Sequence, residues 1–213
     1  VPISLAGGMR EMVSRHALIR KLASVETLGS VTTICTDKTG TLTQNQMTVT
    51  KLWVDGQFVD ITGTGYEPVG DFYVNGELVS DLKQFPAVRT TLWVGTINND
   101  AQLEPVGESE GKTTYRMVGD PTEGSILVAA LKAGAAANVV NQNYPRKQEI
   151  PFDSARKRMV TIHNIVNPGH GDISPYGTGE KTNWYTIAVK GAPDVVLDLC
   201  TYRSSMDNTP VPL

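Results

Sequence analysis

The chain has 213 residues, 40% of them hydrophobic, and a formal net charge of −3. This length suits one large domain or two modest ones, with enough apolar side chains for a core. The slightly acidic balance argues against a nucleic-acid partner, which would need a basic surface. No apolar run approaches the roughly 20 residues that cross a bilayer.

Residues 1–22 are predicted to form an amphipathic helix, because Leu5, Met9 and Met12 recur at helical spacing. Basic side chains occupy the other positions of this segment. An ordinary surface helix packed on a sheet would show the same pattern.

The next feature is a β-branched run at residues 31–36, which predicts a strand buried on both faces. An aspartate directly after such a strand lies where open α/β sheets place their chemistry. The glycine that follows lets the backbone come close to an anion, and a carboxylate beside a phosphate cradle is a candidate phosphoryl acceptor. The candidate catalytic residues are therefore Asp37, Lys38, Thr39, Gly40 and Thr41.

Two short strands are predicted at residues 47–54 and 58–61, because the Asp55-Gly56 dipeptide between them favours a hairpin turn. The glycine-spaced stretch 62–70 is interpreted as a loop. A helix is predicted over residues 85–99, where apolar side chains recur at helical spacing.

The polar run at residues 98–101 is expected to cap the end of that helix rather than to serve a function directly. A second helix begins at Asp120, which can cap it, with Pro121 in the first turn. Glu123 lies three residues after the cap, as in a capping box. This helix should stop at Gly134.

Three later strands are predicted around residues 150–152, 159–165 and 184–190, with a polar linker at 167–182 between the last two. Within the linker, Gly177–Thr182 has some likeness to a phosphate-binding loop. However, Glu180 stands where that loop requires glycine, so the segment is interpreted as a hairpin loop.

A short helix is predicted from Pro193 to near Cys200, and the tail 201–213 shows no clear periodicity. Cys35 in the predicted strand and Cys200 at the end of the apolar helix are expected to be inert core thiols in a reducing compartment. The three histidines show no metal-ligand spacing, so no role in chemistry is assigned to them.

The stretch Ile34–Thr50 resembles the phosphorylation signature of P-type cation-transporting ATPases. Three further stretches, 119–123, 151–159 and 189–194, resemble the nucleotide-binding domain of the same family. Related phosphatases of the haloacid-dehalogenase class carry a second aspartate at the position of Thr39, where it acts as general acid and base. Threonine cannot shuttle a proton at neutral pH, so an aspartyl phosphate would persist.

The resemblance implies an α+β nucleotide-binding domain, an antiparallel sheet with flanking helices. This domain is inserted in a haloacid-dehalogenase-like α/β phosphorylation domain, of which only the first part is present. The expected division is a stalk-like helix at 1–22, the start of the phosphorylation domain at 23–45, and a C-terminally incomplete nucleotide-binding domain at 46–213.

The resemblance and the chemistry of adenine together predict an ATP pocket. An aromatic face stacks on the base, a carboxylate accepts from its amino group, lysines attract phosphate, and a glycine permits close approach. The residues in these roles are Glu123, Phe152, Lys157, Lys190 and Gly191.

Four of these five residues have an alternative role. Phe152 could be a core residue, Glu123 only the capping-box partner, and Lys190 a strand residue that faces water. Lys157 could belong to a solvated hairpin edge with its basic neighbours.

The function implied is ATP-driven cation transport through phosphorylation of Asp37, with ATP and Mg²⁺ as cofactors. Asp37 would be one ligand of an incomplete Mg²⁺ site. This chain is expected to be a monomeric, soluble piece from the cytoplasmic face of a membrane pump, which binds ATP but does not turn it over alone.

The missing membrane helices would carry the transported cation, whose identity the sequence does not give. The loop at 62–70, the run at 98–101 and the stretch at 190–193 resemble the type II branch rather than heavy-metal pumps. Within that branch a calcium-pump-like member is expected, and sodium, potassium and proton pumps remain alternatives. The alternatives are a non-transporting, nucleotide-binding regulatory module and a haloacid-dehalogenase-class phosphatase.

Overall fold

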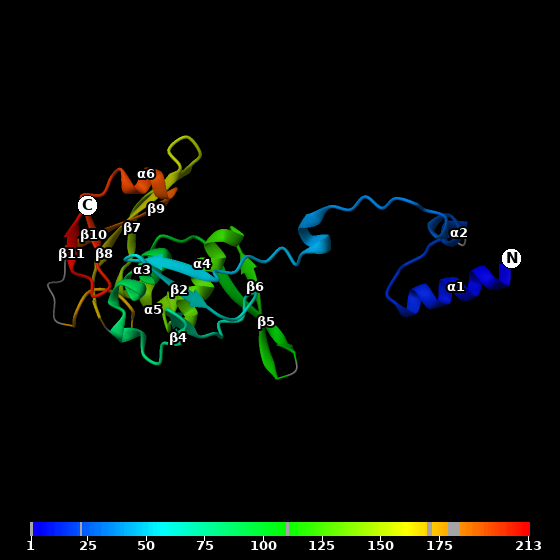
Figure 1. Ribbon diagram of the computed structural model, residues 1–213, viewed down its shortest axis with the longest axis horizontal. Helices are drawn as coiled ribbons and strands as arrows, with labels where there is room; N and C mark the ends of the chain where they lie inside the picture. The colour runs from blue at the N-terminus through cyan, green and yellow to red at the C-terminus, as the bar shows by residue number, and fades with distance from the viewer. Residues whose placement is uncertain (1, 22, 110, 170–171, 179–183) are drawn as a thin grey trace. The chain divides into compact units, whose positions relative to one another are not determined.

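The computed structural model describes residues 2–21, 23–109, 111–169, 172–178 and 184–213 (Figure 1). The chain divides into two compact units, Val1–Gln44 and Asn45–Leu213.

The first unit contains two helices, α1 (Pro2–Ser14) and α2 (Ala23–Gly29). The predicted helix over residues 1–22 is confirmed only in its first part, because α1 ends at Ser14. The helix ends because His16 adopts a left-handed conformation, with φ of 62°, and the amide of Ala17 turns back to the carbonyl of Met12 at 2.9 Å. This arrangement is a common way to terminate a helix.

The predicted strand at residues 31–36 is also wrong. The segment is not part of any sheet, and Val31 and Ile34 are 47% and 80% exposed. Cys35 is exposed as well, so it is not a core thiol. A buried strand needs neighbouring strands and a covering layer, and the described residues of this unit provide neither.

The candidate catalytic residues form an exposed, irregular turn, η1 (Lys38–Leu42), directly after Asp37. Gly40 has a φ of 77°, a conformation that favours glycine. Thr43 closes the turn, because its amide donates to the carbonyl of Lys38 at 3.2 Å and its hydroxyl accepts from the amide of Gly40 at 3.4 Å.

The second unit begins with an antiparallel sheet of four strands in sequence order, in which the predicted hairpin around Asp55-Gly56 is confirmed. Both turn residues have positive φ, 47° and 78°, as a tight two-residue hairpin requires. The stretch 62–70 is a loop, as predicted. The strands are β1 (Lys51–Val54), β2 (Gln57–Ile61), β3 (Phe72–Val74) and β4 (Glu77–Leu78).

Helices share a hydrophobic core with this sheet and supply a large part of it. The predicted helix over 85–99 is confirmed as α3, which contacts α4 and α5. The predicted stop at Gly134 is confirmed too, since its φ of 85° directly follows the C-cap of α4. The helices are η2 (Leu82–Gln84), α3 (Pro86–Ile97), α4 (Pro121–Lys132) and α5 (Ala137–Asn143).

A second sheet contains the three predicted later strands, in the order β7-β8-β9 and antiparallel throughout. Alternate residues of the central strand β8 are buried, so one face of this sheet lies against the core. A separate hairpin of β5 and β6 was not predicted. The strands are β5 (Gln102–Ser109), β6 (Lys112–Val118), β7 (Arg146–Asp153), β8 (Arg158–Ile165) and β9 (Trp184–Gly191).

The core contains an aromatic cluster in which the Trp93 ring meets Tyr144 and Tyr176 edge-on, with centroids 5.1 and 5.6 Å apart. His163 is buried, and its Nδ1 lies 2.8 Å from the carbonyl of Tyr144. Burial lowers the pKa of this histidine, so it is a neutral core residue at pH 7.

The predicted helix at Pro193 is α6 (Pro193–Leu197), and it ends earlier than expected. Cys200 lies beyond it and is exposed, so its prediction as a core thiol is wrong. The tail forms a hairpin of β10 (Tyr202–Ser204) and β11 (Pro210–Pro212), which the sequence did not predict. Residues 179–182 of the Gly177–Thr182 segment lie outside the described residues.

The second unit is therefore a mixed α+β fold with antiparallel sheets, as predicted. Among the described helices, no single one is long and apolar enough to cross a bilayer. Helices α4 and α5 reach that length and composition only as a pair, and they are bent by 92° at their junction.

Candidate functional site

A cavity of about 470 Å³ lies where the start of α4 meets β7 and β9. Its volume falls within the range of roughly 300–1,000 Å³ that small-molecule sites occupy. Its walls are mainly apolar, with a few charged groups among them. The lining residues are Asp120, Thr122, Glu123, Ile126, Phe152, Lys190 and Gly191.

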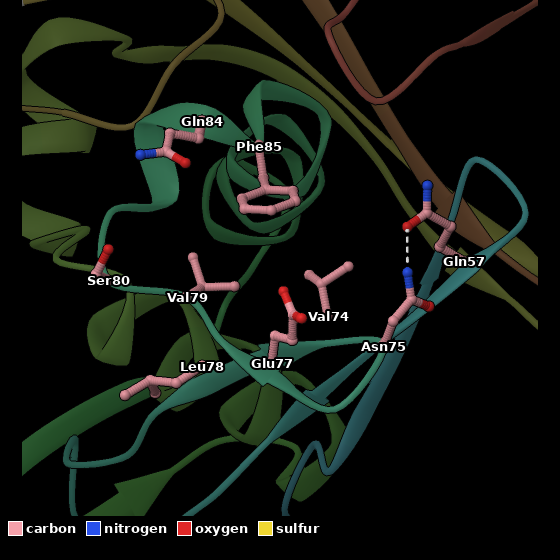
Figure 2. A pocket seen from close by; sticks show the side chains of 9 residues that line it. All are labelled: Gln57, Val74, Asn75, Glu77, Leu78, Val79, Ser80, Gln84 and Phe85. Carbon is pink, nitrogen blue, oxygen red and sulfur yellow. Dashed lines mark hydrogen bonds between the residues drawn. The ribbon is translucent and has the colours of Figure 1, made fainter.

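Figure 2 shows another cavity, of about 460 Å³, beside β3 and β4. Its lining is mostly polar and includes Asn75, whose amide donates to Gln57 at 3.2 Å. Of the described residues, Glu77 is the only charged one that lines it, and no lysine or arginine among them does so. A carboxylate without a basic partner repels a polyphosphate, so this second cavity does not suit a nucleotide.

The N-terminus of α4 fixes one wall of the first cavity. Asp120 caps the helix as predicted, since its carboxylate accepts from the amides of Thr122 at 2.7 Å and Glu123 at 3.3 Å. Pro121 occupies the first turn. The hydrogen bonds from Thr122 lower the pKa of the Asp120 carboxyl, so it is ionised at neutral pH.

Glu123 and Lys190 form an ion pair in the cavity wall. Lys190 Nζ lies 2.5 Å from Glu123 Oε1, and the two side chains are only 22% and 17% exposed. Lys190 Nζ also donates to the carbonyl of Asn98 at 2.5 Å. The alternative in which Lys190 faces water is therefore wrong.

The capping-box role of Glu123 is wrong as well. Its Oε2 accepts from the amide of Asp100 at 2.8 Å, so the carboxylate turns toward the end of α3 instead of back toward Asp120. The predicted capping role of residues 98–101 is confirmed in part. The amide of Asn98 donates to the Val94 carbonyl, and Asn99 Nδ2 donates to Gly95 at 3.1 Å. The same turn also contacts the cavity wall.

Phe152 on β7 and Gly191 on β9 line the cavity from the second sheet. Phe152 is 62% exposed, so it is not a core residue, and its ring is available to a ligand. A Cβ on Gly191 would lie 2.4 Å from the carbonyl of Lys157. Glycine is therefore needed here for close packing of the chain on β8, in addition to any approach of a ligand.

Lys157 does not line the cavity. It occupies the turn between β7 and β8 with a positive φ of 50°, and its side chain is exposed. Its amide donates to the carbonyl of Asp153 at 2.7 Å, and its own carbonyl accepts from Ala192 at 3.0 Å. The structure thus brings four of the five predicted pocket residues together and leaves Lys157 at the hairpin edge.

Three lining residues were not predicted: Asp120 as part of the wall, Thr122 and Ile126. The signal for the last two was present, because Thr122 and Ile126 lie four residues apart on the face of α4 that also carries Glu123. Ile126 is held against α3, where a Cβ on Gly95 would lie 2.4 Å from its Cγ2.

Asp37, the predicted phosphoryl acceptor and Mg²⁺ ligand, lies in the first unit and is exposed. Among the described residues, no group of three or more His, Cys, Asp or Glu side chains could hold a metal ion. Mg²⁺ prefers six oxygen ligands in octahedral geometry, and one carboxylate does not provide such a site.

Comparison with known proteins identifies the family. Residues 87–213, more than half of the chain, match the family model described as P-type ATPase, cytoplasmic domain N. The chain belongs to the P-type cation-transporting ATPases, and its second unit contains their cytoplasmic domain N.

Several relatives are each 39% identical to the chain. They include the cation-transporting ATPase pma1 of Synechocystis, matched over 94% of the chain, and the calcium-transporting ATPase of Bacillus subtilis, matched over 92%. The human calcium-transporting ATPase type 2C member 1 is matched over 98% of the chain. The matched part is 20% of the length of each of these relatives.

Proposed function

We propose that the cavity between α4, β7 and β9 binds the adenine end of ATP, within an ATP-driven cation transporter. The observation that carries this proposal is the paired Glu123 and Lys190 beside the open ring of Phe152. An apolar cavity with a few convergent polar groups is the usual form of a small-molecule site. Membership of the family supports the choice of ATP.

The ion pair changes the role of Lys190, which the sequence predicts to attract phosphate, and leaves the predicted role of Glu123 unchanged. Because Lys190 Nζ and Glu123 Oε1 are 2.5 Å apart, both must act on the same part of the ligand. The carboxylate accepts from the exocyclic amino group of adenine, and the ammonium donates to a neighbouring ring nitrogen. Lys190 is therefore assigned to the base rather than to the phosphates.

Phe152 provides the stacking surface. Base–aromatic stacking contributes about 1–3 kcal/mol per base. The exposed ring lies on the same sheet as Lys190, and the apolar side chain of Ile126 lines the cavity from α4. A flat base enclosed by these apolar groups would form hydrogen bonds with the ion pair through its polar edge.

We further propose that Asp37 accepts the terminal phosphoryl group of ATP. A carboxylate oxygen attacks the γ-phosphorus, the bond to the oxygen bridging the β- and γ-phosphates breaks, and ADP leaves with that oxygen's electron pair. The supports are the signature at Ile34–Thr50 and the absence of a second acid at Thr39. The product is an acyl phosphate with no neighbouring side chain in the signature able to activate water.

Transport itself is proposed for the whole protein, since the chain spans about a fifth of the length of its relatives. That protein would be membrane-bound, with this chain on the cytoplasmic face. Two of the relatives named above are called calcium-transporting, which supports a calcium-pump-like cation specificity. The domain division at 22 and 45, and the insertion into a haloacid-dehalogenase-like domain, belong to this proposal.

Calorimetric titration of the chain with ATP tests the pocket. Phe152→Ala should weaken ATP binding about tenfold or more, because the stacking surface is lost. Phe58→Ala is the matched control, since Phe58 is also exposed, at 55%, and lies on β2 outside the cavity. Equal ATP affinities in the two variants would refute the assignment.

Phosphorylation of the full-length protein in membranes tests Asp37. Labelled ATP should give a hydroxylamine-sensitive phosphoprotein that Asp37→Asn abolishes, because hydroxylamine cleaves acyl phosphates. A protein that binds ATP without forming this label would instead be a non-transporting regulatory module. The isolated chain is expected to release no phosphate in either case.

A further inference from the structure

We propose that Arg146 is a positioning residue that sets the selectivity of the pocket for adenine over guanine. It acts through the turn at the end of α3, Asn98–Asp100. This inference rests on the proposed nucleotide-binding function. Arg146 does not line the cavity, so any effect on the ligand must pass through other groups.

Arg146 holds the turn from one side. It begins β7, and its side chain is 27% exposed. One guanidinium nitrogen, Nη2, donates to the carbonyl of Asn99 at 2.9 Å and to that of Ile97 at 3.4 Å. The other, Nη1, lies 2.6 Å from Asp100 Oδ1 and 2.6 Å from Glu149 Oε2. The planar fork thus fixes both the backbone and the side chain of the turn.

The opposite side of the turn holds the ion pair of the pocket. The amide of Asp100 donates to Glu123 Oε2 at 2.8 Å, and Asn99 Nδ2 donates to the carbonyl of Glu123 at 2.8 Å. The carbonyl of Asn98 accepts from Lys190 Nζ at 2.5 Å. One oxygen of Glu123 is therefore occupied by the turn, and the other remains beside Lys190 at the cavity.

This arrangement has a consequence for base recognition. Adenine presents an amino group at the position where guanine presents a carbonyl oxygen. A carboxylate held in one orientation accepts from the amino group and repels the carbonyl. A carboxylate released from the turn can rotate away, and the penalty against guanine then falls.

A purely structural role for Arg146 makes a different prediction. A basic side chain at the C-terminus of α3 stabilises the helix by contacting its last carbonyls. Loss of that contact would lower the folded fraction, which weakens ATP and GTP binding by the same factor. The ratio of the two affinities therefore distinguishes positioning from stability.

The experiment measures dissociation constants for ATP and GTP with the 213-residue chain and its variants at a temperature where each is folded. Arg146→Ala should weaken ATP binding about tenfold, a typical coupling between contacting groups, and GTP binding much less. Arg146→Lys keeps the charge but loses the fork, and its ATP-to-GTP ratio should lie between those of wild type and Arg146→Ala.

Arg116→Ala is the matched control. Arg116 forms a comparable ion pair with Glu104 at 2.7 Å, but on the β5–β6 hairpin and with 66% of its side chain exposed. Its ATP-to-GTP ratio should equal that of wild type. An unchanged ratio in folded Arg146→Ala would overturn the inference.

Hydrogen exchange at the amide of Asp100 tests the positioning by Arg146 without any nucleotide, so it is independent of the proposed function. This amide should exchange faster in Arg146→Ala than in wild type, because Glu123 no longer stays in place to accept from it. If wild type binds no nucleotide, the proposed function fails, and the exchange rate still tests whether Arg146 holds Glu123 in place through the turn. Equal exchange in the two proteins would show that Arg146 does not position Glu123.

Discussion

The ion pair of Glu123 and Lys190 makes a quantitative prediction about stability. Glu123→Gln removes one charge, Lys190→Met removes the other, and the double variant removes both. Breaking a fully buried pair costs about 3–5 kcal/mol, because one charge is left uncompensated. This pair is 17% and 22% exposed, and each partner keeps a hydrogen bond to the Asn98–Asp100 turn.

We therefore expect each single change to lower the free energy of unfolding by about 1–2 kcal/mol, and the double variant to lose less than the sum. The coupling should be roughly 1 kcal/mol, measured by urea unfolding followed by circular dichroism. The matched control is Lys51 with Asp60, a pair at 3.0 Å whose side chains are 50% and 46% exposed. Its coupling should stay below about 0.5 kcal/mol. A coupling between Glu123 and Lys190 no larger than that of the control would refute the reasoning.

Three further predictions concern the second unit. Asp120→Ala should lower the free energy of unfolding by about 1 kcal/mol, seen by urea unfolding. Because the folded pKa of Asp120 lies below 3.8, this contribution is present above pH 3.8 and is lost as the pH falls further; an equal loss at pH 2 and pH 7 would contradict it. Burial raises the pKa of Tyr144 to about 12 from 10.0. Its contribution to the free energy of unfolding is therefore present below pH 10 and is lost as the pH rises through 12. Absorbance titration at the tyrosinate band should show a late step that Tyr144→Phe removes. Asn98, fully buried, donates to Met159 at 3.2 Å and Ala188 at 2.9 Å. Asn98→Ala should cost about 2–3 kcal/mol in thermal unfolding, against little for exposed Asn141→Ala.

Local patterns in the sequence predicted much of the second unit. The Asp55-Gly56 dipeptide specified its hairpin, because both residues adopt positive φ there. Asp120 and Gly134 marked the start and stop of α4 through side-chain capping and a left-handed residue. These signals act within a few residues, so they do not depend on the rest of the fold.

The errors arose where the structure depends on distant partners. Residues 31–36 have the composition of a buried strand, but the described residues of the first unit provide no neighbouring strand. The hairpin of β5 and β6 and that of β10 and β11 were missed because their strands are largely exposed and lack an apolar alternation. In such strands, backbone pairing decides the structure and side-chain pattern carries little information.

The site shows the same division. The family resemblance and the chemistry of adenine identified Glu123, Phe152, Lys190 and Gly191, which come together in the cavity. The contact that holds Glu123 in place could not be predicted, because its partner Asp100 lies 23 residues earlier and is brought near only by the packing of α3 against α4. The role of Arg146 could not be predicted for the same reason, since the carbonyls and the Asp100 carboxylate that it contacts lie at the end of another element.

The most direct test of the nucleotide pocket is amide NMR of the isotopically labelled chain during titration with ATP. The account predicts saturable shifts concentrated at residues 120–126, 152 and 190–191, with smaller shifts in the Asn98–Asp100 turn. Shifts centred on the cavity of Figure 2, at residues 74–85, would contradict this assignment. So would the absence of any saturable shift in the folded chain.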